Sequence, residues 1–415
     1  MKCEILSIGS ELTSGQNLDT NSQWLSRQLA EIGIVVGWHT TLADDLEANI
    51  DAVRIASRRA GLVLATGGLG PTQDDLTREA LARVAGVELV EDAESLRRIE
   101  EMFRRRNRAM PERNRVQALF PAGAEPIPNE HGTAPGIWMR LGDCWLAAMP
   151  GVPSEMYAMF QTQVRPRLLA LGLGGGVLVQ RKINTFGLGE SAIEEKLLDL
   201  TRRGHVPEVG ITVHDAVISL RILARAPTLA EAQAQIAPVE QTIRERLGPL
   251  VFGADAEDLQ DAVAALLGQK RRSLATAEGV TAGLVAEQLS SVPGISTWFR
   301  GGIIAYDNRL KVELLGVPQT LIDSHGAVSA EVAEAMAVGC RTRLRTDLAV
   351  STVGVAGPGD LGPDRPAGLV YVALAWSGGV SSVRFSWAGS RAEVQRRTAK
   401  LALNRVRLHL LDQEG

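Results

Sequence analysis

A glycine-rich segment, TGGLGPT at residues 66–72, has the composition of a phosphate-binding loop. It follows the apolar run GLVLA and precedes a stretch of helical periodicity that opens with two adjacent carboxylates, Asp74 and Asp75. Glycine lets backbone N–H groups approach an anion closely, and the positive end of the following helix dipole adds to the attraction. The residues of this loop that we expect to hold phosphate are Gly67, Gly68, Gly70 and Thr72.

The two carboxylates after the loop admit two interpretations. Acidic residues at the start of a helix are usually N-terminal caps. Adjacent carboxylates beside a phosphate loop are also hard oxygen ligands for a divalent cation that bridges the phosphate. The order of strand, glycine loop and helix is the one that phosphate binding requires, so it favours the functional interpretation of Asp74 and Asp75.

Polar residues elsewhere are expected to reach the same sheet edge, because loops at the carboxyl ends of parallel strands form the ligand crevice of open α/β sheets. Glu11 follows the first apolar strand and is a candidate for binding metal or substrate, whereas Asp19 and Asp44 alone would be helix caps. The clusters at 129–136 and 150–155 supply further glycine and amide surface, with tight turns as the alternative. The remaining substrate-binding candidates are Asp44, Asn21, Gly132 and Thr133.

The elements that would position these residues alternate between short apolar runs and stretches of helical period. Repeated βα units predict a parallel sheet covered by helices. The expected strands are 3–9, 34–40, 61–66 and 144–149, and the expected helices lie near 20–32 and 46–59 and from about 153 to 171.

In the rest of the chain the pattern of predicted strands and helices changes twice. Residues 178–253 have the order β-α-β-β-α-β, typical of a small split-βαβ domain, with a capping box from Thr228 to Glu231 and with His214 and Asp215 at a hairpin turn. We interpret this part as a structural spacer. From about residue 257 a third α/β unit begins and ends in a long helix that starts at Arg391.

The predicted fold class is therefore α/β with three domains, at residues 1–172, 177–253 and 257–413. The length of 415 residues fits two to four domains of ordinary size. Glycine is unusually frequent, at 42 residues or about one in ten against an average of about 7%. We expect much of this glycine in phosphate-facing and turn loops at 67–70, 132–136, 301–302 and 354–359.

Charge and cysteine content exclude several classes of protein. A net charge of −4 gives no cationic field for nucleic acid or an anionic membrane, and no apolar stretch reaches the length of a membrane span. The three cysteines are widely spaced and match neither a disulfide framework nor a zinc site. We expect a cytoplasmic protein without nucleic-acid or membrane partners.

Four motifs, GSELTSGQNLDTN, GGLGPTQDDLT, NEHGTAPG and PGVPSEM, resemble the N-terminal domain of the competence/damage-inducible protein A (CinA) family. That domain is similar to the molybdopterin-binding fold of molybdenum-cofactor enzymes. The third segment of the chain resembles the C-terminal domain of the same family, so the resemblance covers nearly the whole chain in the family's order.

For the N-terminal domain the resemblance implies metal-dependent hydrolysis of ADP-ribose to AMP and ribose 5-phosphate. Asp74, Asp75 and Glu11 would be catalytic, and Asp75 and Glu11 would bind a divalent ion (Mg²⁺, Mn²⁺ or Co²⁺), with K⁺ as a further cofactor. The expected partners are small-molecule nucleotides and a second copy of the chain in a homodimer. The alternatives are a molybdopterin-binding protein and a non-catalytic competence or recombination partner.

For the C-terminal domain the resemblance implies nicotinamide mononucleotide amidase activity, with a nucleophilic serine in the motif AESCTGG. This chain reads AEGVTAG at 277–283, so Gly279 replaces the serine, and glycine cannot attack a carbonyl. Thr281 could substitute as the nucleophile, but we expect the amidase to be impaired and the domain to bind a nucleotide or only to pack. The family's other site residues would be Lys311 as the base, Tyr306, Asn308, Gly357 and the phosphate-binding or carboxylate-binding Arg391.

Overall fold

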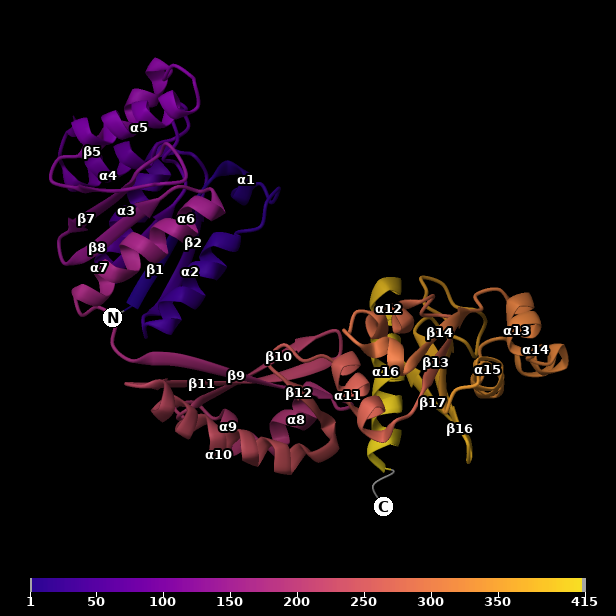
Figure 1. The fold of residues 1–415 in the computed structure, drawn as a ribbon. Coiled ribbons are helices and arrows are strands. Elements are labelled where there is room, and N and C mark those ends of the chain that lie inside the picture. The colour runs from indigo at the N-terminus through magenta and orange to yellow at the C-terminus, as the bar shows by residue number, and fades with distance from the viewer. Residues whose placement is uncertain (1, 413–415) are drawn as a thin grey trace. The chain divides into compact units, whose positions relative to one another are not determined.

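The computed structural model describes residues 2–412 and divides the chain into two compact units (Figure 1). The first unit comprises the chain through Val179 together with Ala224–Ala234, and the second comprises Gln180–Leu223 and the chain from Gln235 onward. Within the described residues, no helix is long and apolar enough to cross a membrane.

A six-stranded sheet forms the centre of the first unit. Its four neighbouring strands β2, β1, β3 and β8 are parallel, as predicted, whereas β7 and β6 pair antiparallel. The sheet is mixed because β7 and β8 are joined by the two-residue turn Gly142–Asp143, and so short a connection allows only antiparallel neighbours. In spatial order the strands are β2 (Val35–Leu42), β1 (Lys2–Ile8), β3 (Leu62–Thr66), β8 (Cys144–Met149), β7 (Gly136–Leu141) and β6 (Glu125–Ile127).

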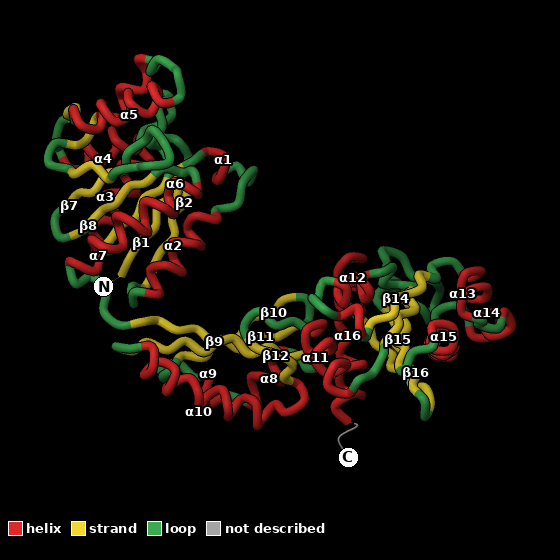
Figure 2. Tube along the Cα trace, viewed as in Figure 1, coloured by secondary structure: helices red, strands yellow, loops and turns green. Residues whose placement is uncertain are grey.

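Helices cover both faces of this sheet, as the repeated βα units predict, so that the unit has three layers (Figure 2). One face, including Ile5 and Leu64, packs against α2, α6 and α7, and the other face, including Leu6 and Val63, packs against α3 and α4. Beyond these layers lie α5 and the small two-stranded sheet of β4 and β5. The elements are α1 (Ser10–Thr13), α2 (Thr20–Glu31), α3 (Leu46–Arg59), α4 (Thr77–Ala85), α5 (Ala93–Arg105), α6 (Pro153–Met159), α7 (Arg165–Ala170), β4 (Leu89–Glu91) and β5 (Leu119–Pro121).

The middle segment has the predicted β-α-β-β-α-β order, except that its first helix is broken at Leu197 into two short helices. The hairpin between β10 and β11 turns at Asp215 and Ala216, whose φ values of 45° and 63° are typical of a tight two-residue turn. The predicted role of Asp215 in a turn is thus confirmed. The elements are β9 (Val177–Phe186), α8 (Glu190–Lys196), α9 (Leu198–Thr201), β10 (Glu208–His214), β11 (Val217–Ala226), α10 (Leu229–Leu247) and β12 (Val251–Ala254), with sheet order β10-β11-β9-β12.

A five-stranded sheet in the order β14-β13-β15-β16-β17 forms the last part of the chain, with its first three strands parallel. The strands are β13 (Leu274–Glu278), β14 (Phe299–Ile304), β15 (Leu348–Gly354), β16 (Leu369–Trp376) and β17 (Gly379–Ser386). The helices are α11 (Leu259–Lys270), α12 (Leu284–Ser290), α13 (Asn308–Leu315), α14 (Gln319–His325), α15 (Ala330–Leu344) and α16 (Arg391–Asp412).

The expectation that Gly301 and Gly302 form a phosphate-facing loop is wrong, because both lie within β14. Gly302 pairs with Thr276 of β13, and a Cβ atom at residue 302 would lie 2.2 Å from the Thr276 hydroxyl oxygen. Glycine is required there so that the two strands can approach each other.

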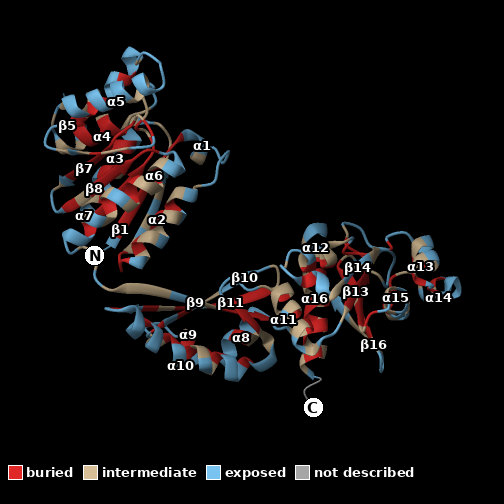
Figure 3. Ribbon diagram, viewed as in Figure 1, coloured by how far each residue is buried: buried red, intermediate tan, exposed pale blue. Residues whose placement is uncertain are grey.

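The second unit has one continuous core. Phe186, Val217 and Phe252 of the middle segment pack into the same buried cluster as residues of α11, α12 and α16. Figure 3 shows buried stretches in β11, α12 and α16. The Arg396 guanidinium of α16 also donates a hydrogen bond of 2.8 Å to the Asp215 carboxylate at the hairpin turn. The middle segment is therefore fastened to the C-terminal segment by both apolar packing and an ion pair.

Candidate functional site

The glycine loop runs from β3 to α4 across the ends of the central strands. Gly67 and Gly68 have φ values of 106° and 64°, a region that favours glycine. A Cβ atom at Gly67 would lie 2.0 Å from the carbonyl oxygen of Ile8. The backbone N–H groups of Gly68 and Leu69 have no acceptor in the described part of the chain, so they are available to an anion. We call the loop segment that carries them, residues 67–70, the phosphate cradle.

Asp75 shapes this loop from within. Its Oδ1 accepts a hydrogen bond from the Gly70 N–H at 2.7 Å, and its Oδ2 accepts one from the Thr72 N–H at 2.8 Å and another from the Thr72 hydroxyl. A Cβ atom at Gly70 would lie 2.4 Å from the same carboxylate. Helix α4 begins only at Thr77, so Asp75 anchors the loop and does not cap the helix.

Arg78 binds the carbonyl oxygens of the glycine loop, a role that the sequence did not predict. Its guanidinium is buried and donates hydrogen bonds to the carbonyl oxygens of Leu69 and Gly70. Burial lowers the pKa of Arg78 to about 10, and the nearby Asp75 carboxylate opposes this shift. By holding these two carbonyl groups, Arg78 fixes the peptide units that directly follow the free N–H groups of Gly68 and Leu69.

The loop forms one wall of a pocket of about 510 Å³. The structure brings most of the predicted N-terminal residues together here. The predicted residues that line the pocket are Glu11, Asp44, Gly67, Gly68, Gly70, Asp74, Asp75 and Thr133. Within the described chain, Thr72, Asn21 and Gly132 do not line it: Thr72 binds Asp75, and the Asn21 side-chain amide donates to the Gly151 carbonyl oxygen at 2.8 Å.

Glu155 faces the same pocket from the first turn of α6. Its Oε2 accepts a hydrogen bond of 2.7 Å from Nδ2 of Asn129. A Cβ atom at Gly132 would lie 2.1 Å from this carboxylate oxygen, so the glycine leaves room for it. Glu155 is thus a carboxylate in the lining of the same pocket that a neighbouring amide holds in place.

Sequence reasoning assigned no role to Glu155 or to Gln117, which also lines the pocket. The only available signal for Glu155 was its place in the PGVPSEM motif. Gln117 lies in a 3-10 helix (Glu112–Ala118) with no motif around it.

Among residues 2–412, no group of three or more His, Cys, Asp or Glu side chains is arranged to hold a metal ion. Both oxygens of Asp75 are taken up by the loop, and the Glu11 carboxylate folds against Gly9, where a Cβ atom would lie 2.6 Å from it. The protein alone therefore builds no preformed metal cage. The donor set fits only an ion that is bound by one or two carboxylates together with substrate phosphates, as is usual for Mg²⁺.

A second pocket, of about 390 Å³, lies in the second unit. Nζ of Lys311 donates a hydrogen bond of 2.8 Å to Oδ1 of Asn308, and burial lowers the pKa of this lysine, although Asp307 opposes the shift. Arg391 donates to the Gly357 carbonyl oxygen at 2.8 Å and to the Tyr306 hydroxyl. The predicted residues gathered here are Gly279, Tyr306, Asn308, Lys311, Gly357 and Arg391.

Thr281 does not belong to this group. Its hydroxyl is buried, donates to the Glu278 carboxylate at 2.7 Å and lies 2.7 Å from the Thr352 hydroxyl. Thr281 also precedes helix α12, which begins only at Leu284. Glu278 instead caps that helix by accepting backbone N–H groups from Gly283, Val285 and Ala286. A hydroxyl engaged in this way is poorly placed to replace the missing serine.

Comparison with known families matches three segments of the chain. "Probable molybdopterin binding domain" matches residues 4–170, "Damage-inducible protein CinA KH domain" matches residues 180–253, and "CinA C-terminal domain" matches residues 256–410.

Full-length relatives are similar along their entire length. A CinA-like protein of Dictyoglomus thermophilum is 42% identical over 412 residues, which cover 99% of this chain and 100% of the relative. One of Synechococcus elongatus is 42% identical over 415 residues, covering 99% of this chain and 98% of the relative. Among solved structures, the protein CinA of Thermoplasma acidophilum is 31% identical, covers 40% of this chain and 96% of its own, and has a TM-score of 0.37.

Proposed function

The chain belongs to the CinA family, and from this premise we propose that its first unit hydrolyses the pyrophosphate of ADP-ribose to AMP and ribose 5-phosphate. The observation that carries the proposal is that one pocket is lined both by the glycine loop, with the unpaired N–H groups of Gly68 and Leu69, and by the Glu155 carboxylate that Asn129 holds in place. Pyrophosphate hydrolysis needs donors for the phosphate oxygens and a base for the attacking water, and the pocket offers both.

In the proposed reaction, the N–H groups of Gly68 and Leu69 bind phosphate oxygens and stabilise the charge that grows on them. Glu155 accepts a proton from water as the water oxygen forms a bond to one phosphorus atom. The bond between that phosphorus and the bridging oxygen breaks, and the bridging oxygen leaves with the other phosphate. Asn129 keeps the Glu155 carboxylate in position through its hydrogen bond.

A divalent ion (Mg²⁺, Mn²⁺ or Co²⁺), together with K⁺, is part of this proposal. It would neutralise phosphate charge when bound with the substrate. Glu11 and Asp74 line the pocket and would hold it together with the phosphates, whereas Asp75 would act through the loop that it anchors.

The test is chromatographic analysis of purified full-length protein incubated with ADP-ribose. We expect equimolar AMP and ribose 5-phosphate, loss of activity with a chelator, and recovery with one of the three divalent ions. Absence of AMP under all these conditions would contradict the proposal. Binding of molybdopterin in preference to ADP-ribose would favour the alternative of a pterin-binding protein.

For the second unit we propose binding of a nucleotide anion, with nicotinamide mononucleotide as the first candidate, without amide hydrolysis. Lys311 and Arg391 bring two cationic side chains to one pocket, while the nucleophile position is Gly279. Calorimetry should show binding that Arg391→Ala weakens, and an ammonia assay should show no turnover. Release of ammonia above the blank would contradict this proposal.

A further inference from the structure

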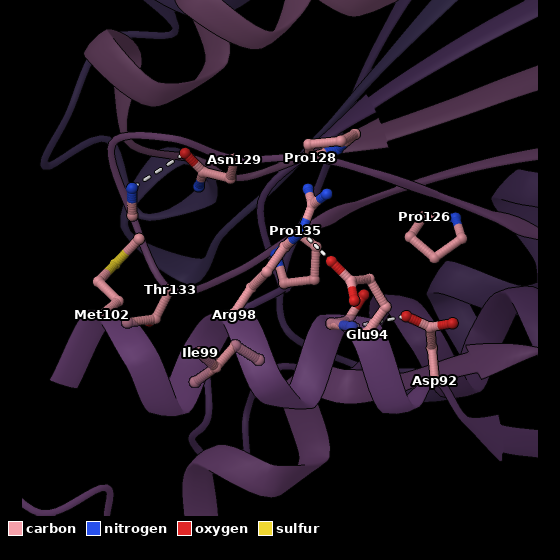
Figure 4. Close-up of a pocket in the computed structure, with 12 residues that line it drawn as sticks. Asp92, Glu94, Arg98, Ile99, Met102, Pro126, Pro128, Asn129, Thr133 and Pro135 are labelled. Carbon is pink, nitrogen blue, oxygen red and sulfur yellow. Dashed lines mark hydrogen bonds and ion pairs between the residues drawn. The ribbon is translucent and has the colours of Figure 1, made fainter. Parts of the chain in front are cut away.

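In the first unit, a further cavity, separate from the two pockets described above, adjoins the phosphate cradle. It has a volume of about 260 Å³ and lies between α5 and the segment from Pro126 to Pro135 (Figure 4). Thr133 lines both this cavity and the cradle pocket. Asn129 joins them as well, because it lines the cavity while its side-chain amide holds Glu155 of the cradle pocket.

The walls of this cavity are mainly apolar, unlike those of the cradle. Ile99 and Met102 lie one turn apart on α5, facing a segment rich in proline (Figure 4). Charged side chains at the rim are paired within the protein: Nε of Arg98 donates to Glu94 at 2.8 Å, and Asp92 accepts the Ser95 N–H at 2.7 Å. The proline side chains that complete the walls are Pro126, Pro128 and Pro135.

The proline-rich wall is preformed. Oδ1 of Asn129 accepts backbone N–H groups from His131 at 3.0 Å and from Gly132 at 2.9 Å, and its Nδ2 donates to the Ala134 carbonyl oxygen at 2.9 Å. One side chain therefore closes the loop that carries this wall and also orients Glu155. A mainly apolar cavity beside a polar cradle is usual for small-molecule sites, which combine apolar walls with a few polar groups.

We infer that this cavity receives the base of the nucleotide whose phosphates bind in the cradle, an inference that rests on the proposed function. A flat base has two apolar faces to bury against Ile99, Met102 and the prolines, whereas a sugar carries a hydroxyl group on most of its carbon atoms and has less apolar surface to bury there. The volume lies just under the range of about 300–1,000 Å³ for whole drug-sized ligands, as befits a single ring system. Thr133, at the junction, then lies beside the ribose.

The test compares two phosphates that differ by the base, AMP and ribose 5-phosphate. Their dissociation constants are measured by calorimetry on the full-length chain carrying Arg391→Ala, so that the guanidinium of the other pocket does not contribute. We expect AMP to bind at least about 10-fold more tightly than ribose 5-phosphate. Equal affinities would overturn the base pocket while leaving the phosphate cradle intact, and failure of both ligands to bind would overturn the proposed function together with it.

A filling variant sharpens the comparison. Met102→Trp should weaken AMP to the affinity of ribose 5-phosphate and leave ribose 5-phosphate unchanged within about 2-fold, because the indole occupies the place of the base. Met110→Trp, outside the cavity, is the matched control and should alter neither. Equal weakening of both ligands by Met102→Trp, or an unchanged AMP affinity, would contradict the inference. If Met102→Trp does not fold, the comparison of AMP with ribose 5-phosphate on the chain that keeps Met102 still tests the inference, because it needs no variant of the cavity.

Discussion

Gly279 lies so close to Thr352 that a Cβ atom at residue 279 would be 2.9 Å from the Thr352 carbonyl oxygen. The same oxygen accepts the Gly279 N–H at 2.8 Å, and Thr352 belongs to the central strand β15. A side chain at residue 279 must therefore displace a backbone group of the sheet. The loss of the family's serine is accompanied by backbone packing that suits glycine.

Gly279→Ser is expected to lower the free energy of unfolding of the second unit by about 1–3 kcal/mol, because the added atoms overpack this contact. Urea unfolding followed by circular dichroism measures the change. We also expect neither the wild type nor the variant to release ammonia from nicotinamide mononucleotide. A variant of unchanged stability that hydrolyses the amide would show that the pocket still accepts the serine.

Ala282 occupies the left-handed region with φ 52°, at a position where the family motif has glycine. A side chain with a Cβ atom is strained there, by about 1–2 kcal/mol, although glycine loses more entropy on folding. Ala282→Gly should thus raise the free energy of unfolding, by about 1 kcal/mol at most. The measurement is denaturant unfolding of both proteins, compared where the free energy of unfolding has the same dependence on denaturant concentration. A clear destabilisation by Ala282→Gly would mean that the strain is absent.

Asp75 offers a way to separate loop anchoring from metal binding. Asp75→Ala removes all three hydrogen bonds to the loop and should lower kcat/KM for ADP-ribose by about 100-fold. Asp75→Asn keeps one acceptor oxygen, so the loss should be smaller. The metal concentration that gives half-maximal activity should not change in Asp75→Asn. Recovery of the variants at high metal concentration would instead identify Asp75 as a metal ligand.

Residue types and their order sufficed to predict the layered sheet, the glycine loop and most of the pocket lining, because these depend on local periodicity. They did not reveal which donors the Asp75 carboxylate meets, since that depends on how the loop folds back on itself. Arg78 could not be distinguished from an exposed helix residue, because its burial and its hydrogen bonds to the loop carbonyl groups are tertiary contacts. Gly302 was mistaken for a loop residue since the close approach of Thr276 is a tertiary contact.

The ion pair between Asp215 and Arg396 should make the stability of the second unit depend on pH. The hydrogen bond from Arg396 holds the pKa of Asp215 below its usual value, although burial opposes this. A carboxyl group with a lowered pKa in the folded state stabilises the fold above its unfolded pKa and loses this effect as the pH falls through the folded value. Asp215→Asn should be less stable than the wild type at pH 7, and the difference should shrink below about pH 4. Melting curves across this range test it, and a constant difference would contradict it.

The most direct measurement is the rate of AMP release from ADP-ribose by the wild type and by Glu155→Gln, side by side at saturating substrate and metal. The glutamine can still accept the hydrogen bond from Asn129 but cannot take a proton from water. We expect the wild type to release AMP and the variant to be slower by about 100-fold or more, with KM and AMP affinity nearly unchanged. No AMP from the wild type, or equal rates for the two proteins, would contradict hydrolysis at this cradle with Glu155 as its base.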